Sequence, residues 1–479
     1  MTCRLPARIV GDMTSSPRFR RSILLGALAL VTAVVVAPPS DSAVAQIAAR
    51  RSSNRIAPGV KLVRITKSGP IAAYVLRIDP AKDSTVDVGL PRATLGGYAP
   101  TSEIGRSHNA IAAVNGDYSF SGGRPRHAFA QDGEIVQTGV RSAGDGFGVS
   151  EDETRAFAGH PTIRITAHVK GTTRDLEIDE WNSGDPRGGE INGYSGVAGS
   201  LERPPGGACS ARFLKDGPIG WAQDGKVGRD YIVDKVGCGA DAMGLQDGIV
   251  ISAEAGGTQA DKIRQLNGGD GIRLTWSFGY PRVMDWMGGQ PELIRNGNIV
   301  APRNCGYICN RQPRTALGAT ANGTILMAVV DGRRSDYSVG MTLEQLARFM
   351  KDEGAVRAVN LDGGGSTTMW VKGNIVNRPS DGGQRSVTNA FLLLPNGDPN
   401  QPRMQDLSSR TMYSTEMAET SDVSVSPEEA AEAWALAQAD PGSTGGLVYA
   451  LSKGRLLDGA RLEAPDLTVA DTFARSLGR

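Results

Sequence analysis

Apolar and polar residues alternate in clear blocks in one stretch of the chain, residues 324–366. An unbroken apolar run at 325–330 and a second, mostly apolar run at 355–361 have the length and composition of buried strands. Between them, Thr342-Leu343-Glu344-Gln345 has the form of a helix capping box, and apolar residues follow it at helical spacing until Gly354, a typical helix stop. The pattern predicts a strand, a helix and a second strand.

The order of these elements places two carboxylates near each other. A helix that crosses between two strands makes the strands parallel, and the connection is nearly always right-handed. Asp331 and Asp362 directly follow the two runs, so both are expected at the same sheet edge. Their strands would be about 4.8 Å apart, or about twice that with one strand between them. Glycosidases use carboxylate pairs about 5–10 Å apart, although an aspartate before glycine is also a common turn residue.

Short strand-like runs separated by turns that contain glycine occupy most of the remaining chain. They lie at residues 60–65, 71–78, 86–90, 110–114 and 387–394, and residues 121–310 have the same character. The 62 glycines and 26 prolines agree with such a turn-rich protein. We therefore predict an α+β fold: a mixed sheet with a parallel βαβ unit at the active edge, many short strands and a helical C-terminal extension.

The N-terminal residues 1–45 have the features of a signal peptide. Arg20 and Arg21 precede an apolar run at 23–37, and Ala43-Val44-Ala45 offers a small-residue cleavage site. The run is shorter than the roughly 20 residues of a membrane span, which favours a cleaved signal over an anchor. The arginine pair also fits a loose twin-arginine signal. We expect a secreted or extracytoplasmic protein without a stable membrane span after cleavage.

The composition of the segments before and after residues 56–397 differs from that of the central region and predicts further boundaries. We expect a polar linker at 46–55, a folded domain at 56–397, and a partly helical or flexible extension at 398–479, in which Ser426-Pro427-Glu428 is a good helix start. The 52 Lys and Arg nearly balance the 51 Asp and Glu. This balance predicts no general attraction to nucleic acid or to an anionic membrane.

Four cysteines remain after the predicted signal peptide. An even number in an exported chain favours two disulfides, and we expect Cys209–Cys238 and Cys305–Cys309. A zinc site is disfavoured, because Cys305 and Cys309 lack a second cysteine or histidine pair at metal-binding spacing. We predict no metal and no cofactor.

Several polar residues accompany the two aspartates. Arg314 precedes a strand just upstream, and further arginines follow at 333, 334 and 385. Because a guanidinium matches phosphate bidentately, arginines gathered at one sheet edge indicate an anionic ligand. Asn115 ends the run at 110–114 and could bond a sugar hydroxyl or a phosphate oxygen, although Asn-Gly is also a common turn.

Four motifs occur in order with tight spacing: Pro313-Arg314-Thr315, Val330-Asp331-Gly332-Arg333, Ser338-Val339-Gly340-Met341-Thr342-Leu343 and Asn360-Leu361-Asp362-Gly363-Gly364-Gly365-Ser366. Together they resemble the phosphodiester glycosidase domain family. The turns Asn115-Gly116-Asp117-Tyr118 and Gly288-Gly289-Gln290-Pro291 and the end from Arg385 to Asn389 also resemble its pattern. The resemblance covers roughly residues 56–395.

The resemblance implies a hydrolase that cleaves the sugar C1–O bond of a sugar-1-phosphodiester, here in a phosphorylated carbohydrate or envelope polysaccharide. Asp362 would be the nucleophile or base and Asp331 its partner. The groups expected to bind the substrate are Arg314, Arg333, Arg385, Asn115, Asn360, Ser366 and the backbone of Gly363, Gly364 and Gly365. Two alternatives stay open: a non-catalytic glycan- or cell-wall-binding module, and an ordinary glycoside hydrolase that acts on a neutral polysaccharide.

Overall fold

The computed structural model describes residues 49–79, 84–140, 142–199, 204–222, 224–245 and 247–395. The expected signal peptide and the expected C-terminal extension lie outside these residues. Residues 50–55, expected as linker, instead form most of β1 (Arg50–Ala57), which pairs with β2 although its side chains are largely exposed. Among the described residues, no helix is both long and apolar enough to cross a membrane.

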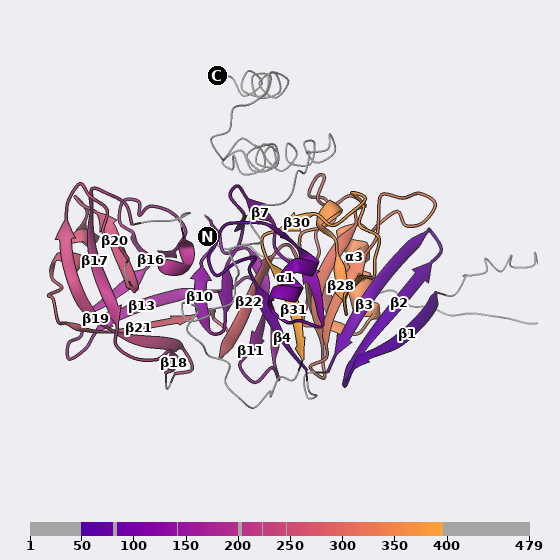
Figure 1. The fold of residues 1–479 in the computed structure, drawn as a ribbon, viewed down its shortest axis with the longest axis horizontal. Coiled ribbons are helices and arrows are strands. Elements are labelled where there is room, and N and C mark those ends of the chain that lie inside the picture. The colour runs from indigo at the N-terminus through magenta and orange to yellow at the C-terminus, as the bar shows by residue number, and fades with distance from the viewer. Residues whose placement is uncertain are drawn as a thin grey trace, which may run out of the picture. The chain divides into compact units, whose positions relative to one another are not determined.

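The sheet that carries the predicted strands has eight members in the order β1-β2-β3-β26-β25-β27-β23-β24. It combines strands from the N-terminal part of the described chain with strands near its C-terminal end (Figure 1). Besides β1, its strands are β2 (Val60–Lys67), β3 (Ile71–Ile78), β23 (Glu292–Arg295), β24 (Asn298–Ile299), β25 (Arg314–Thr320), β26 (Ile325–Val330) and β27 (Ala355–Asn360).

The expected strand, helix and strand are present as β26, α3 (Leu343–Asp352) and β27, and the structure has the wider of the two expected spacings, with one strand between β26 and β27. The expected mixed sheet is wrong here, because each neighbouring pair in this sheet is antiparallel. β25 lies between β26 and β27 and pairs antiparallel with both. The reason is local: β25 and β26 are joined by a short turn at 321–324, and this hairpin occupies the edge of β26 that a parallel neighbour would need. β26 and β27 still run in the same direction, so their carboxyl ends reach the same edge, roughly 9.6 Å apart.

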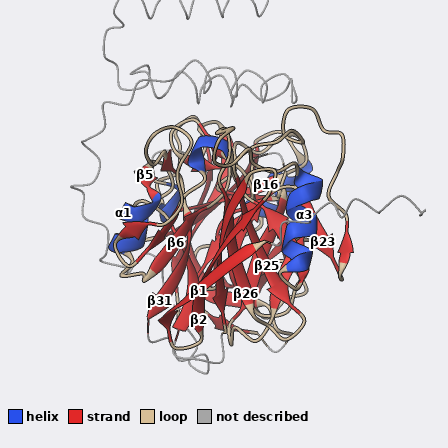
Figure 2. Cartoon of the chain, turned by 90° about the vertical axis from the view of Figure 1, so that its right-hand side faces the viewer, coloured by secondary structure: helices blue, strands red, loops and turns tan. Residues whose placement is uncertain are grey.

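Helix α3 begins with the predicted capping box. The Thr342 hydroxyl accepts a hydrogen bond from the Gln345 backbone N–H, and the Gln345 side chain accepts one from the Thr342 N–H. Gly354, with a φ of 93°, follows its end. The helix packs beside β23 and β27 (Figure 2) and buries Leu343, Leu346, Ala347, Phe349 and Met350. The capping residue therefore fixes where this apolar face meets the sheet.

Loss of this cap tests its contribution. Replacement of Thr342 by alanine removes the bond to the Gln345 N–H and is expected to lower the free energy of unfolding by about 1 kcal/mol. Urea unfolding of the variant and the unchanged protein measures the difference. An unchanged free energy of unfolding would show that water replaces the cap without loss.

A second sheet faces the first across a shared core. Its order is β29-β28-β6-β31-β4, and the core includes Leu76, Met327 and Val359 from the first sheet with Val114 and Phe391 from the second. Its strands are β4 (Ser84–Gly89), β6 (Ala112–Asn115), β28 (Met369–Val371), β29 (Asn374–Ile375) and β31 (Ala390–Pro395), and α1 (Thr101–Ser107) packs on it. Each sheet thus buries one face against the other.

A five-stranded sheet, β10-β9-β22-β11-β12, shares the same core through Phe129, Phe147 and Met287. Its strands are β9 (Phe129–Gln131), β10 (Glu134–Gln137), β11 (Asp145–Ser150), β12 (Ala156–Gly159) and β22 (Val283–Gly289). The small pairs are β5 (Ala99–Pro100) with β30 (Ser386–Val387), and β7 (Ser119–Phe120) with β8 (Arg124–Pro125). The carboxyl end of β22 carries the Gly288-Gly289-Gln290-Pro291 turn.

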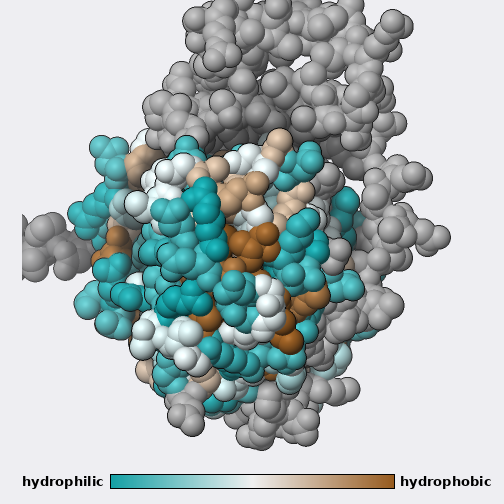
Figure 3. Space-filling model, turned by 90° about the vertical axis from the view of Figure 1, so that its left-hand side faces the viewer, coloured by the Kyte–Doolittle hydropathy of each residue, from teal (hydrophilic) through white to brown (hydrophobic). Residues whose placement is uncertain are grey.

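The middle of the chain forms a nine-stranded sheet, whose core also includes Ala130, Ile135 and Trp286 from the five-stranded sheet. In this sheet β15 and β16 pair in parallel. The face of the molecule in Figure 3 is largely hydrophilic, with a few hydrophobic residues among the polar ones. The strands are β13 (Arg164–Val169), β14 (Asp175–Ile178), β15 (Glu180–Trp181), β16 (Ile191–Ser195), β17 (Ala208–Lys215), β18 (Gly220–Trp221), β19 (Val227–Cys238), β20 (Gly248–Glu254) and β21 (Gly271–Ser277), with α2 (Thr258–Arg264) and η1 (Gly196–Ala198).

Both expected disulfides are confirmed. Cys209 and Cys238 are bonded and lie directly opposite each other on β17 and β19. Cys305 and Cys309 are bonded and close a small loop between β24 and β25. The second disulfide shapes the loop whose carbonyl groups Arg314 contacts.

Candidate active site

Asp362 follows β27 and begins the glycine turn that contains η2 (Gly364–Ser366). Its side chain is partly exposed, and its Oδ1 accepts a hydrogen bond from the Gly363 N–H at 2.9 Å. Its backbone is held on both sides, because the N–H donates to the Gly116 carbonyl and the carbonyl accepts from Asn115 Nδ2 at 2.7 Å. Asp362 is thus a carboxylate that solvent can reach on a backbone that is fixed.

Both the nitrogen and the oxygen of the Asn115 side-chain amide form hydrogen bonds within the protein. Besides the bond to Asp362, its Oδ1 accepts from the Thr315 hydroxyl at 2.6 Å and from the Thr368 N–H at 3.1 Å. It is fully buried at the end of β6. The predicted contact of Asn115 with substrate stays a prediction, and its hydrogen bonds support a positioning role.

Tyr118 completes this part of the site, although no role was assigned to it from the sequence. Its hydroxyl accepts a hydrogen bond from Asn360 Nδ2 at 2.9 Å and donates to the Gln290 carbonyl at 3.3 Å. Burial and the negative charge of Asp362 raise the pKa of the Tyr118 phenol well above its usual value. The phenol therefore remains protonated beside the carboxylate.

Tyr118 is held in turn by a buried aspartate and histidine. Asp117 accepts hydrogen bonds from the Tyr118 N–H and the His127 N–H, and its Oδ1 lies 2.7 Å from His127 Nδ1. The Asp117 N–H donates to Asn389 Oδ1. Gly116 allows this approach, because a Cβ at that position would lie 2.3 Å from Asn389 Oδ1. The polar character of Asn115-Gly116-Asp117-Tyr118 was the sequence signal for this network.

Several buried polar atoms on the ends of these strands have no hydrogen-bond partner within the described part of the chain. They are Asn360 Oδ1, Ser366 Oγ, Thr368 Oγ1, Thr388 Oγ1 and Asn389 Nδ2. Buried polar groups in folded proteins nearly always have partners. These atoms are available to the polar groups of a ligand or of ordered water, and the predicted substrate contacts of Asn360 and Ser366 stay predictions.

Asp331 is placed differently from Asp362. It is 1% exposed, and its carboxylate accepts hydrogen bonds from Asn377 Nδ2, the Arg378 N–H and the Tyr337 hydroxyl at 2.9–3.1 Å. These donors come from the two loops that follow β26 and β29. Asp331 thus ties the two loops together at the sheet edge.

The ionisation of Asp331 gives a second measurable expectation. Burial raises the pKa of its carboxyl above the ordinary value, against the three hydrogen bonds, which lower it. The folded state therefore binds a proton more readily than the unfolded state between about pH 3.9 and the raised value. As the pH falls through that window, the unchanged protein should gain stability relative to the Asp331→Asn variant. Urea unfolding of both proteins at neutral and mildly acidic pH measures this, and a relative loss on acidification would contradict it.

The three predicted arginines divide into two groups. Arg314 is buried, and its guanidinium donates to the carbonyl groups of Met341, Ile308 and Asn310 at 2.5–2.9 Å. These bonds support a structural role, and its predicted contact with phosphate stays a prediction. Arg333 and Arg385 instead converge on one carboxylate, Asp381, next to Gly365.

The Asp381 cluster lies at the far end of the glycine turn from Asp362. Arg385 donates to Asp381 Oδ2 through Nε and a terminal nitrogen at 3.2 and 2.8 Å, and an Arg333 nitrogen lies 3.6 Å from Oδ1. A Cβ added to Gly365 would lie 1.7 Å from Asp381 Oδ2 and 2.3 Å from an Arg385 nitrogen. Sequence reasoning assigned nothing to Asp381, because its contact with Arg333 depends on the fold. The turn thus joins a partly exposed carboxylate to a cluster of guanidinium groups.

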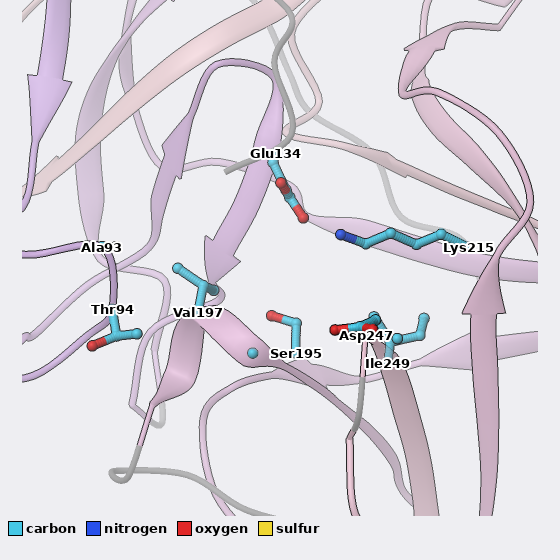
Figure 4. Close-up of a pocket in the computed structure, with 10 residues that line it drawn as sticks. Ala93, Thr94, Glu134, Ser195, Val197, Lys215, Asp247 and Ile249 are labelled. Atoms are coloured by element: carbon cyan, nitrogen blue, oxygen red, sulfur yellow. The ribbon is translucent and has the colours of Figure 1, made fainter. Parts of the chain in front are cut away.

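Two other features lie apart from these residues. The carboxylates of Asp87, Asp132 and Asp285 are buried within 4.8 Å of one another, a spacing that suits a divalent cation, but they include none of the predicted site residues. A cavity of about 320 Å³ is lined by Glu134, Lys215 and eight other residues. The Glu134 and Lys215 side chains point toward each other there (Figure 4).

Comparisons with known proteins agree with the resemblance seen in the sequence. The family described as phosphodiester glycosidase matches residues 228–394. The chain is 29% identical over 159 residues to the mouse N-acetylglucosamine-1-phosphodiester alpha-N-acetylglucosaminidase, covering 29% of this chain and 30% of that protein. It is 37% identical over 83 residues to an uncharacterized prophage-derived protein of Bacillus subtilis, covering 17% and 13%.

The chain thus spans less than a third of the length of these two relatives. A hypothetical protein from Synechocystis shares the fold, with a TM-score of 0.56 and 19% identity over 72% of this chain and 63% of that one. The family match contains α3, β25 to β28 and the whole turn from Asp362 to Ser366. Residues 228–394 of this chain therefore match the phosphodiester glycosidase family.

Proposed function

We propose that the protein is a hydrolase that cleaves the bond between sugar C1 and the phosphate oxygen of a sugar-1-phosphodiester. The observation that carries the proposal is the turn from Asp362 to Ser366. One end of the turn presents a partly exposed carboxylate, and Gly365 near the other end lies against the Arg385 guanidinium. Hydrolysis of a sugar-1-phosphodiester needs a carboxylate near the sugar C1 and a cation near the phosphate that is bonded to it.

The chemistry of the substrate suits these groups. When the C1–O bond breaks, its electron pair stays on the phosphate oxygen, and C1 develops oxocarbenium character. Phosphate is a good leaving group, so guanidinium groups that stabilise its charge can take the place of a strong general acid. Asp362 would stabilise C1 or take a proton from the attacking water, whose oxygen becomes the new C1 hydroxyl. The products are a free sugar and a phosphomonoester.

The two aspartates then have separate roles. Asp362 faces the substrate, and Asp331 acts as a positioning residue through the loops that carry Tyr337, Asn377 and Arg378. Asn360 and Ser366 offer buried polar atoms to the sugar or the phosphate. Of the predicted glycine N–H groups, that of Gly363 donates to Asp362 Oδ1 and that of Gly364 to the Pro313 carbonyl, so the Gly365 N–H is the one we propose as an anion contact.

The names of the relatives support a proposed substrate class, and the N-terminal residues support a proposed compartment. The mouse relative acts, by its name, on N-acetylglucosamine-1-phosphodiester. We propose for this chain a sugar-1-phosphodiester in a cell-envelope or extracellular polysaccharide, which an exported protein would meet. The residues of the predicted signal peptide, 1–45, carry the proposal of export.

A panel of substrates tests the proposal against its alternatives. Sugar-1-phosphodiesters and the matching neutral glycosides are incubated with the full chain, and released sugar and phosphomonoester are measured. The proposal expects both products from the diesters and no sugar from the neutral glycosides. Release from the neutral glycosides alone would indicate an ordinary glycoside hydrolase, and saturable glycan binding without release would indicate a binding module.

A further inference from the structure

Arg333, Asp381 and Arg385 form a compact charged cluster on the glycine turn. The Arg385 side chain is 3% exposed and the Arg333 side chain 18%, so both cations are largely withdrawn from water. Among these three residues two positive charges face one negative charge. Asp381 is therefore a counterion that the two arginines share.

Asp381 reaches this position from an exposed loop. The main chain of Asp381, Gly382 and Gly383 faces solvent, while the Asp381 carboxylate turns inward and rests on the Gly365 backbone. Gly382 has a φ of 84°, which a residue with a side chain rarely adopts. The loop tip is thus a turn that glycine permits, without a packed apolar side chain of its own.

Both ends of this loop are anchored independently of Asp381. At one end Asn377 and the Arg378 N–H bond the Asp331 carboxylate. At the other end the Gln384 side chain accepts from the Ser102 N–H and donates to the Ser102 hydroxyl. The tip can therefore leave the arginines without loss of either anchor.

A carboxylate between two guanidinium groups occupies the place that a phosphate would take. Both groups present oxygen atoms with a shared negative charge, and an arginine fork binds either in the same way. A phosphodiester and the Asp381 carboxylate would repel each other if both lay on the same two arginines. One of them has to leave when the other binds.

Building on the proposed function, we propose that Asp381 is the resident counterion of the anion site, and that the phosphate group of the substrate displaces it from Arg333 and Arg385. The carboxylate keeps the two buried cations paired while the site holds no substrate. Binding of phosphate then moves the loop tip at 381–383 outward. Asp381 thereby sets how strongly the site binds any anion.

Calorimetric titration with inorganic phosphate in a phosphate-free buffer tests this directly. The Asp381→Asn variant keeps the shape of the side chain and removes its charge, so this carboxylate no longer competes for the arginines. We expect it to bind phosphate about tenfold more tightly than the unchanged protein. This factor corresponds to an Asp381 carboxylate that occupies the arginines in about nine-tenths of the unchanged molecules. Asp381→Ser, a second variant without the carboxylate, should behave in the same way.

Two controls separate the outcomes. Asp336 is an exposed aspartate on the loop after β26, and Asp336→Asn, with the same change in charge, should leave phosphate affinity unchanged. Arg385→Gln should abolish binding. Equal or weaker binding by both Asp381 variants would overturn the displacement while leaving the proposed hydrolase intact. Absence of phosphate binding in every folded protein would overturn the anion site and, with it, the proposed use of the arginines.

Discussion

Replacement of Asp362 by asparagine is expected to lower kcat/KM on a sugar-1-phosphodiester about 10³-fold. The variant keeps an oxygen for the Gly363 N–H, and the side chain is partly exposed, so the folded structure should persist. What is lost is the charge that stabilises C1 or accepts the proton from water. Steady-state kinetics with purified variant and unchanged protein measure the loss, and thermal unfolding checks the fold.

Asp336→Asn is the matched control for this variant, since it removes an exposed negative charge from a neighbouring loop. Its kcat/KM should stay near that of the unchanged protein. Near-native turnover by a folded Asp362→Asn variant would show that another residue performs the chemistry.

Replacement of Asn115 by alanine should affect both stability and activity. Its amide joins three separate elements: the Asp362 carbonyl after β27, the Thr315 hydroxyl on β25 and the Thr368 N–H before β28. Without it, fully buried polar groups lose their partners, and we expect the free energy of unfolding to fall by about 3 kcal/mol. Because Asp362 loses its backbone support, kcat should fall as well.

Asn374→Ala provides the comparison for Asn115→Ala. Asn374 is exposed on β29, and its side chain donates to the nearby Lys372 carbonyl, so its loss should change stability by less than about 0.5 kcal/mol. Urea unfolding measures both variants. If Asn115→Ala kept full stability but lost activity, Asn115 would contact the substrate directly rather than position Asp362.

The elements near the site were predictable because their signals are local. The apolar runs of β26 and β27 and the capping box of α3 lie within one stretch of 43 residues, 324–366, and each element can be recognised from its own residues. The order of strands was not, because the pairing of β25 between β26 and β27 depends on a hairpin that competes with the crossover. The prediction that Asp331 and Asp362 follow strands ending at the same sheet edge does not depend on this order. β25 is antiparallel to both β26 and β27, so these two strands run in the same direction.

The roles of individual charges were harder to predict than their positions. Arg314 was expected at phosphate, and its hydrogen bonds go to the Met341 carbonyl and to the Ile308 carbonyl in the loop closed by Cys305 and Cys309. A guanidinium bonds a carbonyl as readily as a phosphate, and the sequence does not reveal which loop returns to it. Asp381 was missed for the same reason, because only the fold brings Arg333 onto it.

The bond that is cleaved tests the central claim most directly. A sugar-1-phosphodiester is hydrolysed in water labelled with heavy oxygen, and the phosphomonoester product is analysed by mass spectrometry. Attack at C1 leaves the phosphomonoester without label, which is the predicted result. Heavy oxygen in the phosphomonoester would mean that the phosphorus–oxygen bond breaks, and the protein would then be a phosphodiesterase rather than a glycosidase.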